Sequence, residues 1–75
     1  MIEIAIGQCL LKKLLDSRGM TQQELSIITG INETQLSGYI SMTRQSMNLK
    51  TAKKIALALN CRIDDLYDWK VINHK

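Results

Sequence analysis

The sequence predicts an all-α domain of five short helices, and we add the hypothesis that the two ends of the chain form a short β pairing. Three observations lead to this fold class. Apolar residues recur at the spacing of one helical face in successive segments. Residues that favour helix N-termini precede those segments, and the 75 residues include no proline. A chain of this length makes one domain, residues 1–75, close to the smallest size that a hydrophobic core alone keeps folded.

The first helix is expected over residues 8–17. Its buried face is formed by Leu10, Leu11, Leu14 and Leu15. Lys12 and Lys13 lie on the outside. Gly19 ends this segment, because glycine suits the left-handed conformation that follows many helices.

The second helix is expected to begin at Thr21, in the stretch "TQQE". The Thr hydroxyl can accept a hydrogen bond from the backbone three residues on, where Glu24 can reach back, and this exchange is a capping box. Leu25 and Ile28 supply the buried face. The helix then stops at Gly30.

The third helix is expected to be capped by Asn32, with Gln35 at the reciprocal position. Three apolar or aromatic residues face inward, namely Leu36, Tyr39 and Ile40. The outward face is small and polar, and consists of Glu33, Thr34, Ser37, Gly38 and Ser41.

A loop is expected over residues 42–47, after which Asn48 caps a fourth helix, "LKTAKKIALALN". Its apolar stripe is Leu49, Ala52, Ile55, Ala56 and Leu59. A last short helix, "IDDLY", places two aspartates in its first turn, where the helix dipole favours them. Ile63 and Leu66 are its buried residues.

The two ends of the chain have a different pattern. "IEIAI" at residues 2–6 alternates with period two, and "WKVI" at residues 69–72 is rich in strand-forming residues. We hypothesise that these segments pair. An isolated two-stranded pair is marginal in water, so it must pack on the helices or on another subunit, where it would help to build a dimer.

Several functional classes find no support in the sequence. Cys9 and Cys61 are expected to be reduced core thiols, and their spacing does not suggest a metal site. His74 is the single histidine, and no nucleophile beside a base is apparent, so we predict no enzyme, catalytic residue, metal or cofactor. No apolar run is long enough to span a bilayer, and a cytoplasmic protein that does not enter a membrane is expected.

The formal net charge is +3, but the basic residues are unevenly distributed. Between positions 44 and 62 there is no acidic residue, and there are five basic ones: Arg44, Lys50, Lys53, Lys54 and Arg62. This pattern fits a basic surface stripe for a polyanion. It fits equally well a solvated helix face rich in lysine.

The second and third helices, at about residues 21–41, are joined by a tight turn that contains glycine, and this is the outline of a helix-turn-helix. Ser26 is small where the third helix would cross close to the second. A protruding helix N-terminus fits the major groove of DNA and presents free backbone N–H groups to phosphates.

"GMTQQELSIITGINETQLSGYISMTR", followed by "NLKTAKKIALALNCRIDDLY", closely resembles the Cro and phage-repressor type of helix-turn-helix domain, the Xre family, over about residues 8–68. The resemblance implies a five-helix, lambda-repressor-like domain that binds double-stranded DNA sequence-specifically as a homodimer. It further implies a small bacterial or prophage regulator that acts on the nucleoid as a repressor, by occluding a promoter.

The same resemblance assigns residue roles. Gln22 matches a phosphate-contacting position whose amide can also brace the third helix. Positions that read bases, or neighbour those that do, are matched by Asn32, Glu33, Thr34, Ser37 and Gly38, with Ser41 further along the same face. Thr43 and Arg44 match contacts to the DNA backbone, which set register but carry no sequence information.

Two departures from the family pattern affect these expectations. Where the family commonly has Glu and then Asn-Gly or Arg-Gly, this chain has Ile40, Ser41 and Met42, so a more apolar and less sharply turned helix end is expected. Gly38 stands where Arg, Gln or Lys is common. It either lets the backbone approach the groove or weakens the reading of bases.

An alternative function uses the same fold. The surface at residues 33–41 is neutral and small and carries Glu33, which can accept from cytosine N4 or simply face solvent. Such a surface also suits a protein partner, as in an antitoxin or an antirepressor-like adaptor. Trp69 is expected to clamp the terminal segment or to contact a second subunit.

Overall fold

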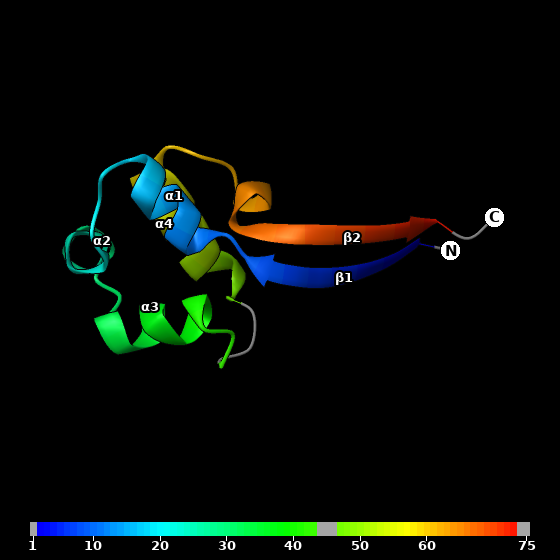
Figure 1. Cartoon of the computed structure of the whole chain (residues 1–75), viewed down its shortest axis with the longest axis horizontal. Coiled ribbons are helices and arrows are strands. Elements are labelled where there is room, and N and C mark those ends of the chain that lie inside the picture. The colour runs from blue at the N-terminus through cyan, green and yellow to red at the C-terminus, as the bar shows by residue number, and fades with distance from the viewer. Residues whose placement is uncertain (1, 44–46, 74–75) are drawn as a thin grey trace.

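The computed structural model describes residues 2–43 and 47–73, which form a helical body and a two-stranded ribbon that projects from it (Figure 1). The described elements are, in chain order, β1 (Ile2–Cys9), α1 (Leu11–Ser17), α2 (Gln22–Thr29), α3 (Glu33–Ile40), α4 (Leu49–Leu59), the 3-10 helix η1 (Ile63–Leu66) and β2 (Tyr67–Asn73). The outer end of the ribbon carries both chain termini (Figure 1).

The predicted fold class needs two corrections. The described residues form four α-helices, and the expected fifth, at "IDDLY", is the four-residue 3-10 helix η1, because β2 already begins at Tyr67 with extended backbone angles. The first helix begins at Leu11 rather than at Gln8. Residues up to Cys9 belong to β1 instead, and the Leu10 N–H continues the connection by donating to the Leu66 carbonyl at 2.8 Å.

The hypothesis that the chain ends pair is confirmed, and they pair within one chain. β1 and β2 are antiparallel, with Ile2 opposite Asn73 and Ile6 opposite Trp69. Both strands are longer than the predicted segments at residues 2–6 and 69–72.

The ribbon contains one irregularity, where β1 has one residue more than β2 between the pairs Ile6–Trp69 and Cys9–Tyr67. Such an extra residue is a β-bulge, which bends a strand and changes the face on which the following side chains lie. Gly7 lies in the bulge, and a Cβ there would be 2.6 Å from the Asp68 carbonyl oxygen. This position therefore requires glycine.

The helix N-termini follow the sequence prediction closely. Thr21 and Glu24 form the complete capping box, and the Asn48 side chain accepts from the Thr51 N–H at 2.8 Å. Asn32 accepts from the Gln35 N–H at 2.7 Å. The reciprocal role predicted for the Gln35 side chain is wrong, because its amide donates to the Tyr39 hydroxyl at 2.8 Å instead.

The hydrophobic core lies between the four helices and the base of the ribbon. Its largest fully buried side chains are Leu11, Leu25, Leu36, Ile55, Leu59 and Leu66. The prediction that Ile28 and Leu49 are buried is wrong, since Ile28 is 58% exposed and Leu49 is 75% exposed. The inner stripe of α2 runs instead through Leu25, Ser26 and Thr29, so Ile28 falls beside it, and Leu49 is the first residue of α4, beyond the packed part of that helix.

Cys9 is buried and Cys61 partly buried, and both are free thiols, as predicted. Burial raises the pKa of both thiols, most simply because a thiolate loses its hydration there. They therefore remain protonated at neutral pH. Within residues 2–43 and 47–73, no helix has the length and apolar character needed to cross a membrane.

Candidate nucleic-acid interface

The turn between α2 and α3 is built around Gly30, whose φ of 75° lies in the left-handed region. The Gly30 N–H donates to the Ser26 carbonyl at 2.8 Å. Thr29 connects the helix to the turn, because its hydroxyl donates to the Leu25 carbonyl and accepts from the Ile31 N–H. Ile31 is buried. The turn is therefore held by the hydrogen bonds of Thr29 before Gly30 and by the burial of Ile31 after it.

Thr29 and Ile31 were not among the predicted site or core residues. The signal that could have found them is local. A Thr before a glycine turn can hydrogen-bond to nearby backbone groups, and an apolar residue directly before an N-cap often anchors the chain as it enters a helix.

α3 presents a polar surface to solvent and is fixed from behind. Asn32, Glu33, Thr34 and Ser37 are exposed, as predicted, and so is Ser41 at the end of the helix. On the inner side, Leu36 is fully buried and Tyr39 is 6% exposed. The first two turns of α3 are thus accessible while the helix as a whole is held in place.

Gln22 and Ser37 connect the first turn of α2 to the outer face of α3. The Gln22 Nε2 group donates to the Ser37 hydroxyl at 3.0 Å. The brace predicted for the Gln22 amide is therefore present. The second N–H of the Gln22 amide and the hydroxyl proton of Ser37 remain chemically able to donate outward.

α3 ends in a sharp turn, so the prediction of a less sharply turned end is wrong. The Met42 N–H donates to the Tyr39 carbonyl and the Thr43 N–H to the Gly38 carbonyl, which together form a Schellman motif. Met42 occupies the left-handed position, with φ of 63°. A methionine stands here in place of the usual glycine, and both hydrogen bonds of the motif still form.

This turn brings Ser41 and Thr43 together, with their hydroxyl oxygens 3.0 Å apart and both side chains exposed. Gly38 is buried, which corrects its predicted outward position. Its carbonyl serves the turn by accepting from the Thr43 N–H. Arg44 lies outside the described residues.

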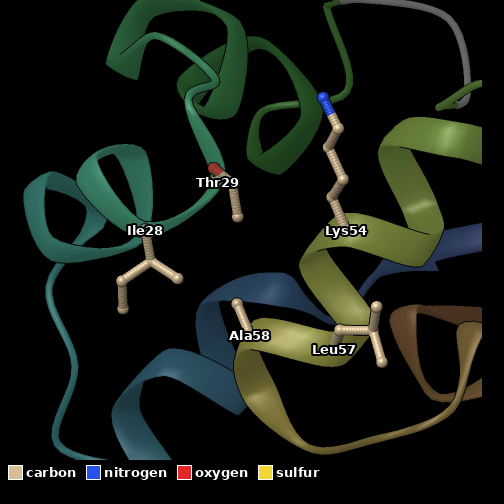
Figure 2. A pocket seen from close by; sticks show the side chains of 5 residues that line it. All are labelled: Ile28, Thr29, Lys54, Leu57 and Ala58. Carbon is tan, nitrogen blue, oxygen red and sulfur yellow. The ribbon is translucent and has the colours of Figure 1, made fainter.

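The basic residues of α4 are exposed, as expected of Lys50, Lys53 and Lys54. They do not form an unbroken basic surface. Lys54 lies at an apolar groove of about 400 Å³ between α2 and α4, where Ile28, Leu57 and Ala58 are its neighbours (Figure 2). The face beside α2 is therefore partly apolar.

Trp69 fixes the C-terminal strand β2 to η1, which is the first of its two predicted roles. Its indole Nε1 donates to the Asp64 carbonyl at 3.0 Å, and its ring meets that of Tyr67 edge to face at 6.0 Å. In the part of the chain that the structure describes, no group of three His, Cys, Asp or Glu side chains could hold a metal ion.

Two helices at a glycine turn, the second exposed along its first two turns and locked from behind, define a helix-turn-helix DNA-binding domain. The comparison with known families agrees, since residues 10–71 match the Cro/C1-type HTH DNA-binding domain. The chain belongs to this family, and it is a DNA-binding transcriptional regulator rather than an enzyme.

Curated relatives come from a prophage of Bacillus subtilis (strain 168). The chain is 47% identical over 74 residues to the SPbeta prophage-derived uncharacterized HTH-type transcriptional regulator YopS, covering 99% of this chain and all of the relative. It is similar to two further SPbeta HTH-type regulators. One is YopO, which is 43% identical over 80% of this chain and 84% of the YopO chain. The other is YotL, which is 29% identical over 79% of this chain and 74% of the YotL chain.

Proposed function

We propose that the protein is a repressor that inserts α3 into the major groove of a specific DNA site. The observation that supports this most strongly is the exposed N-terminal half of α3, held by the buried Leu36 and Tyr39. A helix presented in this way fits a groove about 12 Å wide and can place short side chains against base edges.

In this proposal Thr34 and Ser37 read bases at close range, and Glu33 accepts from cytosine N4. Asn32 keeps the N-terminus of α3 in place beside them. Gly38 is buried and acts through the turn that it supports rather than by direct contact.

The DNA backbone is held on both sides of α3. Gln22 donates to a phosphate from the start of α2, and Ser41, Thr43 and Arg44 contact the backbone beyond the end of α3. Only Arg44 among them is charged, so the affinity depends on it and on the lysines of α4. Phosphate contacts of this kind position the helix and make binding salt-dependent.

One α3 reads only a few base pairs, and we propose that the protein acts as a homodimer. Two-fold symmetry then requires two related half-sites about 34 Å apart along the DNA. A dimer bound in this way in the bacterial cytoplasm would occlude a promoter on the nucleoid.

The test is selection of bound sequences from a random duplex library, followed by selection with variants. Thr34→Ala and Ser37→Ala should relax the base preference at particular positions. Arg44→Ala should instead weaken binding to all sequences and lower the salt slope by about one phosphate contact. The control is Gln23→Ala, an exposed position on α2 that should change neither property.

Two results would contradict the proposal. An unchanged base preference in both α3 variants would show that α3 does not read the groove. The absence of salt-sensitive binding to any duplex would favour a protein partner for the same surface.

A further inference from the structure

One face of the ribbon is a continuation of the hydrophobic core beyond the helices. Along β1 the exposed fraction rises from 5% at Cys9 to 40% at Ile6 and 61% at Ile4. Along β2 it rises from 6% at Tyr67 to 37% at Trp69 and 59% at Val71. The ribbon face that packs on the helices near Cys9 and Tyr67 is therefore exposed to solvent near the chain ends.

The register places these side chains together. Ile6 is opposite Trp69, and Ile4 is opposite Val71. Directly opposite residues of an antiparallel pair lie on the same face, and so do residues two apart along a strand. The bulge at Gly7 brings Cys9 onto this face as well, although Cys9 and Ile6 are three residues apart.

The other face of the ribbon is different. Glu3, Ala5 and Lys70 are exposed there, with Ala5 opposite Lys70. From the pair Ile4–Val71 to the pair Ile6–Trp69 the ribbon is thus amphipathic, with Lys70 on one face and apolar side chains on the other, while the register also places Ile72 opposite Glu3. Since a two-stranded pair is marginal in water, the apolar face requires a cover that the helical body does not provide.

The apolar face is shaped by two hollows on either side of Trp69. A hollow of about 270 Å³ lies between the ribbon base and the start of α4, where Ile6, Leu49 and Trp69 are among its lining residues. Another, of about 380 Å³, is lined by Ile4, Asp64, Trp69 and Val71. Protruding isoleucine and valine side chains of a facing ribbon would fit such hollows.

We infer that this face is the contact surface for a second copy of the chain, and the inference rests on the proposed dimeric DNA binding. The side chains that it would cover are Ile2, Ile4, Ile6, Leu49, Trp69 and Val71. Together they expose on the order of 600 Å², so a two-fold pairing that covers all of them completely removes at most about 1,200 Å² from water, which is the lower bound for a stable specific interface. Two amphipathic ribbons that pack face to face bury their apolar sides and leave their charged sides in water.

The experiment compares two cross-strand pairs on opposite faces of the ribbon. Ile4→Thr with Val71→Thr makes the apolar face polar and keeps β-branched side chains in both strands. Ala5→Thr with Lys70→Thr changes the opposite face. In sedimentation equilibrium the first pair should raise the dimer dissociation constant at least about tenfold, because each two-fold interface then has two methyl groups of Val71 and two ethyl groups of Ile4 replaced by hydroxyls. The second pair should leave it unchanged.

A measurement on the unaltered protein guards against misfolded variants. Trp69 is the single tryptophan and is 37% exposed in the isolated chain. Its fluorescence emission should shift to shorter wavelength as the protein concentration rises through the dimerisation range. Dimer formation with unchanged emission would overturn the inference, and so would a monomer throughout the micromolar range or equal effects of both pairs.

The outcome is separable from that of the proposed function. A dimer that selects a DNA sequence and is unaffected by Ile4→Thr with Val71→Thr would overturn the ribbon contact alone. A ribbon-dependent dimer that selects no DNA would overturn the proposed function alone.

Discussion

The Gln22 side-chain amide donates a hydrogen bond to the Ser37 hydroxyl, with Nε2 and Oγ 3.0 Å apart. The bond joins the first turn of α2, which we propose contacts the DNA backbone, to the outer face of α3, which we propose reads the bases. Each partner orients the other, so the two contacts to DNA should be coupled energetically.

A double-mutant cycle measures this coupling. Gln22→Ala and Ser37→Ala should each weaken binding to the selected site by about 1 to 2 kcal/mol. The double variant should lose about 0.5 to 1.5 kcal/mol less than the sum, because either substitution already breaks the shared bond. The measurement is titration of the duplex at one fixed salt concentration.

Gln23→Ala is the matched control, since Gln23 is the neighbouring glutamine of α2 and is exposed. Alone it should bind the site as the unaltered protein does, and in combination with Ser37→Ala it should add nothing to the loss that Ser37→Ala causes. Strictly additive losses for Gln22 and Ser37 would show that the bond plays no part in DNA binding.

Gly7 allows the close approach of the two strands at the bulge. Gly7→Ala should lower the free energy of unfolding by about 1 to 3 kcal/mol, because a Cβ at 2.6 Å from the Asp68 carbonyl oxygen forces the strands apart. Urea unfolding followed by circular dichroism measures the change.

Gln8→Ala provides the comparison within the same bulge, because Gln8 is exposed and its truncation meets no neighbouring atom that must move. Its effect should remain within about 0.5 kcal/mol. If both variants have the same stability as the unaltered protein, the bulge does not require glycine.

The helix-turn-helix could be predicted because its signals are local. Thr21 with Glu24, the turn at Gly30 and the caps at Asn32 and Asn48 each act over three or four residues, and the structure has each of them. The outward side chains of α3 follow from helical periodicity in the same way. The Gln22 brace, in contrast, was expected only through the family resemblance.

The remaining errors have non-local causes. The β1 boundary at Cys9 depends on pairing with Tyr67, far along the chain, and no short stretch of sequence specifies the bulge at Gly7. Ile28 is apolar and correctly spaced from Leu25, but the packing of α3 and α4 selects the stripe beside it. Gly38 was placed outward by periodicity and by the family resemblance, whereas in the structure it is buried.

Met42 should carry a conformational cost, since it has a φ of 63° without being glycine. We compare Met42→Gly with Met42→Ala, because both remove the side chain and they differ only in the Cβ. The glycine variant should be more stable by about 1 kcal/mol, as the left-handed conformation penalises any Cβ. Thermal and urea unfolding measure the difference.

The neighbouring Ser41 supplies the control, because its φ of −81° and ψ of −4° lie in the right-handed region. At this position Ser41→Gly should be less stable than Ser41→Ala by about 0.5 to 1 kcal/mol. The difference in stability between the glycine and the alanine variant should thus have opposite signs at Met42 and Ser41. The same sign at both positions would contradict the assigned turn.

Tyr67 links stability to alkaline pH. Burial is the largest cause that raises the pKa of its phenol above the ordinary value, while its hydroxyl accepts from the Met47 N–H at 3.3 Å. The folded state therefore holds the phenol proton more tightly than the unfolded chain does. The corresponding stability is fully present below the unfolded pKa of about 10 and is lost as pH rises through the folded pKa.

Tyr67→Phe isolates this effect. Near pH 7 the variant should be less stable by about 1 kcal/mol, because the Met47 N–H loses its acceptor. Above about pH 10 the difference should shrink, since only the unaltered protein has the Tyr67 proton to lose. Urea unfolding of the two proteins across this pH range measures the gap, and a gap that stays constant with pH would show that the Tyr67 phenol is not held in its protonated form by the fold.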